Sequence, residues 1–476
     1  MNRRFQCRPI AVGLAALFVV SSSGTAGEQS FLPNMLRFAN PTGFAATYST
    51  VGKVELTGPF FESLGTNGRA CVTCHQPSTG WTITPANVQA RFKATGGTDP
   101  IFRTNDGSNS PNADVSTLEA RGAAYSVLLS KGLIRVGIGI PQGAEFDLVA
   151  VDDPYGYASA TELSLFRRPL PSTNLKFLST VMFDGRETFK DSASQDCILG
   201  TTTCFATIHF DLAHQSNSAT TGHAQAPQPL TDAQREAIVS FETTLFTAQV
   251  FDHEAGELTA RGALGGPQYL SGQEFYFGIN DVVSGDYRTG AVFNGTVFKL
   301  YDAWNTIDRG GADGSRTEAR RTVARGETLF NTKPIVITGV KGINDDLGVR
   351  DFHGTCTTCH DTPSAGDHSI PAPLDIGLTD ASRRTPDLPL YTLRHNAPPF
   401  ETIQTTDPGR ALSTGKWKDI GRFKGPILRA LATRAPYFHN GSAQDLDAVV
   451  DFYNERFSIG LTDDEKEDLV AFLLTL

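Results

Sequence analysis

Two segments far apart in the chain carry the same arrangement of reactive side chains. Cys71-Val72-Thr73-Cys74-His75 and Cys356-Thr357-Thr358-Cys359-His360 each place two residues between the cysteines and a histidine directly after the second. At this spacing two thiols can bond to the vinyl groups of a haem while the histidine binds the iron. A redox-active thiol pair does not need that histidine, and a zinc site would need two more ligands nearby. The pattern predicts two covalently bound haem c groups, held by Cys71, Cys74 and His75 and by Cys356, Cys359 and His360.

The ligand on the opposite face of each iron decides whether a haem only carries electrons or also reacts. Methionine occurs only at positions 1, 35 and 182, so the second half of the chain offers no thioether. No histidine lies between His75 and His209. Tyr453 shares one face of an expected helix with Leu446 and Val450. It is therefore either a ligand of the second haem or an ordinary core tyrosine.

The composition indicates a loop-rich globular chain. The 476 residues include 41 Lys and Arg, 51 Asp and Glu, 46 Gly and 26 Pro, and the net charge is −10. This balance excludes a multi-span membrane protein and argues against a nucleic-acid or anionic-lipid partner. Residues 1–26 combine early arginines, a short apolar stretch and small residues, as a secretory signal peptide does. A membrane anchor is the alternative, but the apolar stretch is too short to span a bilayer. We expect a periplasmic protein without a membrane span once the signal is removed.

Two further cysteines lie close together outside the haem-binding segments. Cys197 and Cys204 enclose a short loop. In an oxidising compartment we expect a structural disulfide between them, with two free buried thiols as the alternative.

Helix signals are more frequent than strand signals in the rest of the chain. Thr231 to Gln234 forms a capping box, residues 317–330 read as a helix, and Ser442 and Thr462 are expected to cap two helices near the end. We expect a mainly α fold with two cytochrome-c-like haem domains, long loops and insertions. The expected divisions are a signal peptide (1–26), an N-terminal haem c domain (27–254), a linker or insertion (255–316) and a C-terminal haem c domain (317–476).

Four segments carry a family resemblance. Phe183-Asp-Gly-Arg186, Arg422-Phe-Lys-Gly-Pro-Ile-Leu-Arg429, Ala435-Pro-Tyr-Phe-His-Asn-Gly-Ser442 and Val449-Val-Asp-Phe-Tyr-Asn454 occur in that order, together with the two haem-binding segments. In these features the chain resembles the bacterial di-haem cytochrome c peroxidases and the MauG group. The resemblance touches most of residues 55–250 and 317–476.

The resemblance implies different roles for the two haems. The position that matches Tyr453 is a haem ligand in that family, and tyrosine there marks the MauG-like branch. The His75 haem would bind peroxide, and the His360 and Tyr453 haem would store the second oxidising equivalent. Gln215 matches a family glutamine, and His223 falls near the family's distal glutamate, so both are candidate catalytic residues. His209, His214, water or a distant carboxylate are the alternatives for the distal acid-base group.

At two further positions the sequence departs from the family or matches it only weakly. Phe183 stands where the family has a tryptophan between the haems, so it is either part of the electron path or plain core packing. Asn105 is the match for the family's calcium ligand, with the carbonyl oxygens of Arg434 and Pro436, and an ordinary turn at Asn105 is the alternative. His439 is expected to form hydrogen bonds near the second haem.

The expected function is that of a periplasmic di-haem c peroxidase of the MauG-like type. Its partners would be hydrogen peroxide and an electron donor, either a small cytochrome or cupredoxin or the side chains of a protein substrate. A homodimer is usual in the family. A di-haem oxygenase that cleaves an organic substrate is the first alternative, with residues 255–316 lining a channel. A plain electron carrier is the second.

Overall fold

The computed structural model describes residues 30–189, 208–307 and 314–476. The predicted signal peptide and the predicted Cys197 and Cys204 disulfide lie outside these residues. Within the described ranges, none of the helices is both long enough and apolar enough to cross a membrane.

The described residues form short helices and short strands joined by long loops. The α-helices are α1 (Pro85–Thr95), α2 (Leu118–Ala124), α3 (Ser126–Lys131), α4 (Ile208–Gly222), α5 (Asp232–Thr243), α6 (Pro267–Ser271), α7 (Gly314–Thr332), α8 (Ala411–Thr414), α9 (Leu446–Arg456) and α10 (Asp463–Leu474). The strands are β1 (Phe31–Pro33), β2 (Arg37–Asn40), β3 (Gly43–Ser49), β4 (Lys53–Glu55), β5 (Ile134–Ile138), β6 (Phe146–Asp152), β7 (Leu163–Arg167), β8 (Leu245–Asp252), β9 (Gly256–Glu257), β10 (Ile335–Thr338), β11 (Asp351–Gly354), β12 (Leu390–His395) and β13 (Thr402–Thr405).

The strands pair into small antiparallel sheets, so the expectation of a mainly α chain is met only in part. In the described residues the sheets are β1-β4, β2-β3-β8-β9, β5-β7, β13-β12-β6 and β10-β11. These strands are too short to show a clear alternation of apolar and polar residues. All five residues of β7 are buried, for example, and the last of them is Arg167. A sequence search for strands with one buried apolar face and one exposed polar face therefore could not find these strands.

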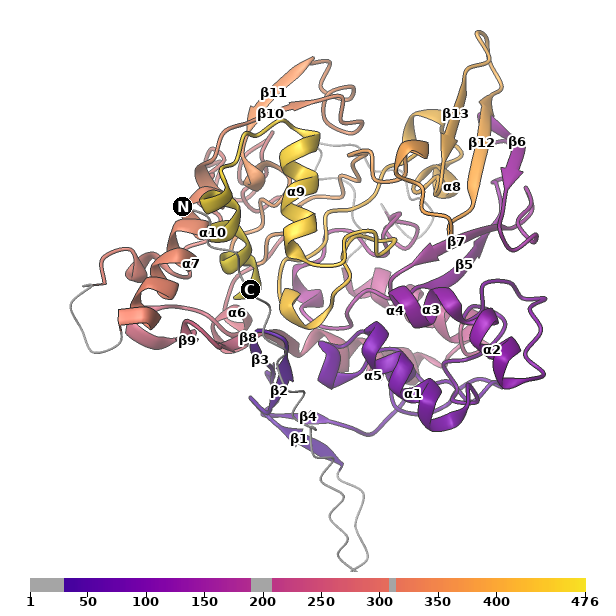
Figure 1. The fold of residues 1–476 in the computed structure, drawn as a ribbon, viewed down its shortest axis with the longest axis horizontal. Helices are drawn as coiled ribbons and strands as arrows, with labels where there is room; N and C mark the ends of the chain where they lie inside the picture. The colour runs from indigo at the N-terminus through magenta and orange to yellow at the C-terminus, as the bar shows by residue number, and fades with distance from the viewer. Residues whose placement is uncertain (1–29, 190–207, 308–313) are drawn as a thin grey trace, which may run out of the picture.

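One sheet joins segments from both halves of the chain. Strand β6 pairs with β12, and Val151 lies opposite Tyr391. In Figure 1, α1, α2, α3 and the β5-β7 pair lie on one side of the molecule, and α7, α9 and α10 lie on the other. Strand β8 connects these regions, because its neighbour β9 belongs to residues 255–316 and its Gln249 amide donates to the carbonyl of Leu476.

Residues 255–316 pack into the core of the second half. Tyr301 and Trp304 are fully buried and stack on each other with ring centroids 4.7 Å apart. The amides of Leu300 and Tyr301 donate to the buried carboxylate of Glu327 on α7, at 2.5 and 2.9 Å. These contacts hold the segment against α7 and α10, although its only regular elements among the described residues are short ones such as β9 and α6.

The helix ends follow local capping chemistry. The predicted capping boxes of α5 and α10 are confirmed, with Thr231 and Thr462 as the N-cap residues. The predicted cap at Ser442 is wrong. Asp445 is the N-cap of α9, and its side chain accepts a hydrogen bond from the amide of Ala448. Either Ser442 or Asp445 could cap a helix, and the structure shows that the chain becomes helical only after the second.

Helices α7 and α10 approach each other closely at a glycine. A Cβ atom on Gly326 would lie 1.9 Å from the carbonyl oxygen of Asp468. That carbonyl belongs to the helix backbone and cannot move aside cheaply. The contact fixes how α10, and with it the C-terminal core, sits on α7.

We predict that Gly326→Ala destabilises the protein despite alanine's better helix propensity. Overpacking costs about 1–3 kcal/mol, whereas replacing glycine inside a helix gains only about 1 kcal/mol. Denaturant unfolding measures the change in the free energy of unfolding between wild type and variant. Gly314→Ala is the matched control in the same helix, because its Cβ would meet no atom within 4 Å. Equal stability of the two variants would contradict the close contact.

Candidate haem sites

A large cavity lies against the first haem-binding segment. Cys71, Cys74 and His75 line it, and it contains about 1700 Å³ that protein atoms do not fill, part of which is open to solvent. Both halves of the chain contribute to its wall, since Leu175, Val181, Leu212 and Ile238 face Pro426 and Ile427. The first segment therefore opens into an apolar space large enough for a flat macrocycle.

The ring of His75 is held in one orientation. Its Nδ1 lies 3.0 Å from the carbonyl oxygen of Trp81, which can only accept a hydrogen bond. Burial lowers the pKa of His75 to about 4, so the ring is neutral. The Trp81 indole is fully buried and donates to Thr47 Oγ1 at 2.9 Å. Nδ1 therefore carries the proton, and Nε2 keeps the lone pair that a metal ligand needs.

Buried cations on the same cavity fit the carboxylate groups of a haem. Lys424, Arg429 and Arg434 line the cavity and are buried or half-buried. Burial lowers the pKa of Lys424 to about 8 and those of Arg429 and Arg434 to about 10. The Nε atoms of both arginines have no hydrogen-bond partner among the described residues. Because Cys71 and Cys74 are also free thiols, these residues fit a covalently attached haem.

One face of α4 supplies a polar edge to this cavity. Gln215, Ala219 and His223 recur at intervals of four residues and all line it. His223 Nδ1 lies 2.5 Å from Asp106 Oδ2, and the other oxygen of Asp106 pairs with Arg69. Burial by itself would raise the pKa of the Asp106 carboxyl, but Arg69 and His223 hold that pKa below its ordinary value. The carboxylate thus stays charged and holds the His223 ring in place.

His223 also faces a second, more open pocket beside the cavity. Asn105, Arg135, Glu162 and Arg186 line that pocket, and it shares Asp106 and His223 with the cavity. Small polar molecules can therefore approach His223 from solvent. The alternatives are placed differently, because neither His209 nor His214 lines either pocket. His209 is exposed beside Glu236, and His214 binds Glu187 at 2.5 Å.

Aromatic rings lie in the wall between the halves. Phe183 lines the cavity, and its ring centroid is 6.0 Å from that of His439. His439 in turn stacks on Phe423 at 4.1 Å. Burial lowers the pKa of His439 to about 4, so this ring is neutral and continues the apolar wall. Phe183 therefore packs in this wall and also faces the first site, and its place in the electron path stays a prediction.

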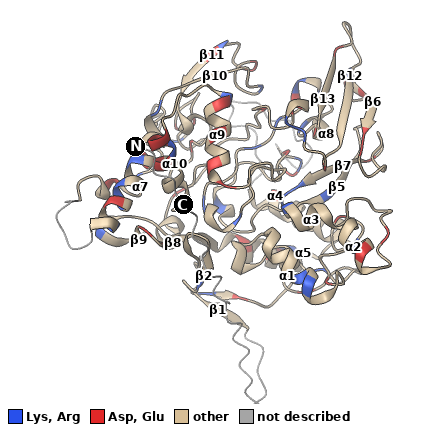
Figure 2. Cartoon of the chain, viewed as in Figure 1, with Lys and Arg blue, Asp and Glu red and all other residues tan. Residues whose placement is uncertain are grey.

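A buried ion-pair network supports this wall. Arg167 on β7 bonds Asp184 at 2.5 Å and Asp407 at 2.7 Å, and Arg186 also pairs with Asp184. Figure 2 shows basic residues on β5 and β7, the strands nearest this network. Although burial alone would raise the pKa of Asp184, Arg186 and Arg167 hold it well below the ordinary value. The Asp-Gly-Arg run thus fixes the loop that carries Phe183.

The second haem-binding segment has a similarly fixed histidine, but the polar side chain near it is a tyrosine. His360 Nδ1 lies 2.6 Å from the carbonyl oxygen of Gly366. Burial raises the pKa of the Tyr453 phenol, and the nearby thiols of Cys359 and Cys356 raise it further. The Tyr453 phenol is thus within electrostatic range of both thiols, and no described residue forms a hydrogen bond with its hydroxyl. Cys356 and Cys359 pack against the apolar cluster around Ile337, which suits a haem.

Asn105 has partners other than those predicted for a calcium site. Its Nδ2 donates to the carbonyls of Gly222 and His223 at 3.3 and 3.4 Å, and its buried Oδ1 has no partner among the described residues. The carbonyl of Arg434 accepts from Arg168 at 3.0 Å. The calcium ion stays a prediction.

Three residues of the first site were not predicted from the sequence. Arg69 and Asp106 complete the His223 contact, and Met182 lines the cavity as a thioether. Arg69 lies two residues before Cys71, which is a local signal. Asp106 has no such signal, because it lies 117 residues from His223 along the chain.

Comparisons with known proteins find partial relatives. No protein-family model matches the chain. It is 29% identical over 234 residues to cytochrome c peroxidase IdrP1 of Pseudomonas sp. (strain SCT), which covers 44% of this chain and 54% of that protein. It is 33% identical over 140 residues to IdrP1 of Denitromonas iodatirespirans, covering 25% and 36%. It is 39% identical over 79 residues to cytochrome c peroxidase Ccp of Escherichia coli (strain K12), covering 16% and 17%.

The matched regions span about half or less of the length of these relatives. A solved structure described as a MauG-like protein associated with microbial copper homeostasis aligns with a TM-score of 0.35 and 16% identity, over 88% of this chain and 87% of that one. The matches to the curated proteins confirm the predicted relationship to the bacterial cytochrome c peroxidases.

We predict that Asp184→Asn strongly destabilises the protein at neutral pH. Breaking a buried ion pair from one side costs about 3–5 kcal/mol, because the partner charge is left uncompensated. The pKa of Asp184 is lowered on folding, so its stabilisation is present above the ordinary carboxyl pKa of about 3.9 and is lost as the pH falls through the folded value.

Denaturant unfolding of wild type and variant over a pH series checks this prediction. The difference in the free energy of unfolding between wild type and variant should be largest near neutral pH and should shrink in acid. Asp232→Asn is the matched control, because Asp232 forms an exposed pair with Arg235 and its loss should leave stability unchanged. A constant difference at every pH would contradict the assignment.

Proposed function

We propose that this relative of the bacterial cytochrome c peroxidases is an exported di-haem c enzyme of the MauG-like type, which reduces hydrogen peroxide at the His75 site. The contact between His223, Asp106 and Arg69 on the cavity of the first haem-binding segment carries this proposal. When bound, the two haems would supply the redox chemistry, with peroxide reduced at the first site and the second oxidising equivalent held at the site of His360 and Tyr453.

His223 is suited to move a proton within the cavity. Splitting the O–O bond of peroxide requires a proton to leave one oxygen and reach the other. With Nδ1–H donating to the Asp106 carboxylate, Nε2 of His223 is free to accept that proton and return it. Asp106 fixes the ring, and the charge of Arg69 keeps Asp106 ionised. Gln215, about two turns earlier on α4, adds an amide that can bind a small polar substrate.

Tyr453 is suited to be the second ligand at the His360 site. Its hydroxyl is within electrostatic range of the Cys356 and Cys359 thiols, and no described residue forms a hydrogen bond with it. A phenolate is a hard anionic donor that stabilises oxidised iron. This property favours holding an oxidising equivalent over passing single electrons on. Electrons between the sites would cross the packed wall at Phe183, His439 and Phe423 by tunnelling, since phenylalanine is difficult to oxidise.

The electrons would come from outside the chain. A small cytochrome, a cupredoxin or the side chains of a protein substrate could supply them, and the enzyme would work in the periplasm, as a homodimer.

Met182 provides the reason for a second candidate function. It lines the first cavity, and a thioether on the open side of the iron would make that haem an electron carrier. As a peroxidase, the wild-type protein would react with peroxide. As an electron carrier whose first iron is closed by Met182, it would not. Reaction only in Met182→Ala would favour the carrier.

We predict that His223→Ala lowers kcat/KM for peroxide by about 10²–10⁴-fold, the usual contribution of a general acid-base group. The assay follows oxidation of a dye by the haem-loaded protein with peroxide. Asp106→Asn should cause a smaller loss, because the imidazole remains but is held less firmly. His209→Ala is the control and should react at the wild-type rate. A near-normal rate in His223→Ala would remove this residue from the mechanism.

We predict that Tyr453→Phe abolishes a phenolate-to-iron absorption band of the oxidised protein. The phenylalanine ring keeps the packing and removes only the donor oxygen. Tyr437→Phe is the matched control, because the Tyr437 hydroxyl donates to the Leu431 carbonyl at 2.9 Å. An unchanged spectrum in Tyr453→Phe, or an equal change in both variants, would exclude Tyr453 as ligand.

A further inference from the structure

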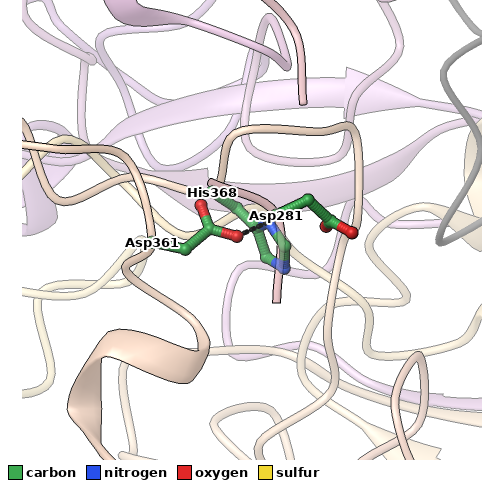
Figure 3. Close-up of side chains that lie close together, drawn as sticks. All are labelled: Asp281, Asp361 and His368. Carbon is green, nitrogen blue, oxygen red and sulfur yellow. Dashed lines mark ion pairs between the residues drawn. The ribbon is translucent and has the colours of Figure 1, made fainter. Parts of the chain in front are cut away.

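Three side chains that can bind a metal meet in the interior beyond the second haem-binding segment. Asp281, Asp361 and His368 each offer a ligand atom, and these atoms all lie within 4.8 Å of one another. Asp281 and Asp361 are 0% exposed, and His368 is 4% exposed. Figure 3 shows the His368 ring between the two carboxylates. The group is therefore a closed site and not a cluster on the surface.

The protein leaves the inward-facing atoms of this group unpartnered. Asp281 Oδ2, Asp361 Oδ2 and both ring nitrogens of His368 have no hydrogen-bond partner among the described residues. His368 Nδ1 approaches Asp361 Oδ2 to 3.2 Å, yet the two do not meet in hydrogen-bond geometry. Buried polar atoms without partners are costly, so an occupant that satisfies them is to be expected.

The other carboxylate oxygens are held from outside the group. Asp281 Oδ1 accepts from the amide and the hydroxyl of Ser284, at 2.5 and 2.6 Å. Asp361 Oδ1 accepts from the Ser369 amide at 2.6 Å. Each carboxylate is thus anchored through one oxygen and presents the other to the centre. This is the arrangement by which outer hydrogen bonds orient metal ligands.

The donor set selects the kind of ion. Two carboxylate oxygens and one imidazole nitrogen suit Zn²⁺ and related first-row divalent ions. Calcium and magnesium prefer oxygen ligands alone. The two negative charges would balance a divalent cation, which removes the penalty of burying them unpaired.

We propose that Asp281, Asp361 and His368 bind one zinc-type divalent ion that is separate from the haem irons. The ion would join two segments far apart in the sequence, which already meet where the Gly278 amide donates to the Ser369 carbonyl at 3.0 Å and Asn280 Nδ2 donates to the Asp361 carbonyl at 3.1 Å. The loop between Asp361 and His368 contains Gly366, whose carbonyl orients His360. The ion would therefore stiffen the support of the second haem-binding histidine.

The test uses the full-length haem-loaded protein. After dialysis against a chelator, the protein is titrated with Zn²⁺, and bound zinc and iron are counted by mass spectrometry of the metals. We expect one zinc per chain and a rise in the thermal unfolding temperature. Asp281→Asn and His368→Gln should weaken zinc binding by at least roughly the 10- to 100-fold loss known for outer-shell changes.

Control measurements make the result decisive. His353→Gln removes an exposed imidazole on β11 and should bind zinc as the wild type does, which excludes surface binding. If both site variants fail to fold, the wild type alone decides, since Zn²⁺ should raise its unfolding temperature and Mg²⁺ should not. The absence of a zinc-dependent rise, an equal rise with Mg²⁺, or zinc binding that survives both variants would overturn the proposal.

Discussion

An imidazole can bind a metal only through the nitrogen that carries no proton, and a backbone carbonyl fixes that choice at both haem-binding segments. His75 donates to Trp81, and His360 donates to Gly366. The two carbonyls are secured in different ways. The Trp81 carbonyl belongs to a fully buried residue packed among aromatic rings, whereas Gly366 lies in a loop. In both segments the accepting carbonyl lies six residues after the histidine, so the same local spacing orients both rings in dissimilar surroundings.

The surroundings also make the two sites chemically different. In the first cavity a charged carboxylate, Asp106, is shared between Arg69 and His223, so a polar group that can move a proton lies in an otherwise apolar wall. Beside the second segment the available group is the phenol of Tyr453. Buried charges need partners, and the structure satisfies this requirement at the wall between the sites with Arg167, Asp184 and Asp407. In the proposed function, one site would serve proton transfer and the other would stabilise oxidised metal.

The sequence predicted the local features well and the long-range features poorly. The capping boxes of α5 and α10 depend on residues only three positions apart, so they could be read directly. The partner of His223 could not, because Asp106 reaches it from another part of the chain. The short strands and the group around His368 likewise arise only from tertiary packing. Residues 255–316 lack periodicity, yet they supply Asp281 and the Tyr301 core contact.

In the proposed enzyme, one iron keeps an open coordination position while the other is closed by a phenol oxygen. Electron paramagnetic resonance of the oxidised, haem-loaded protein distinguishes these states, because spin state reports the ligands on both faces of each iron. We expect one high-spin signal, from the His75 site, and one low-spin signal that changes in Tyr453→Phe. Two low-spin signals that are both indifferent to this substitution would contradict it.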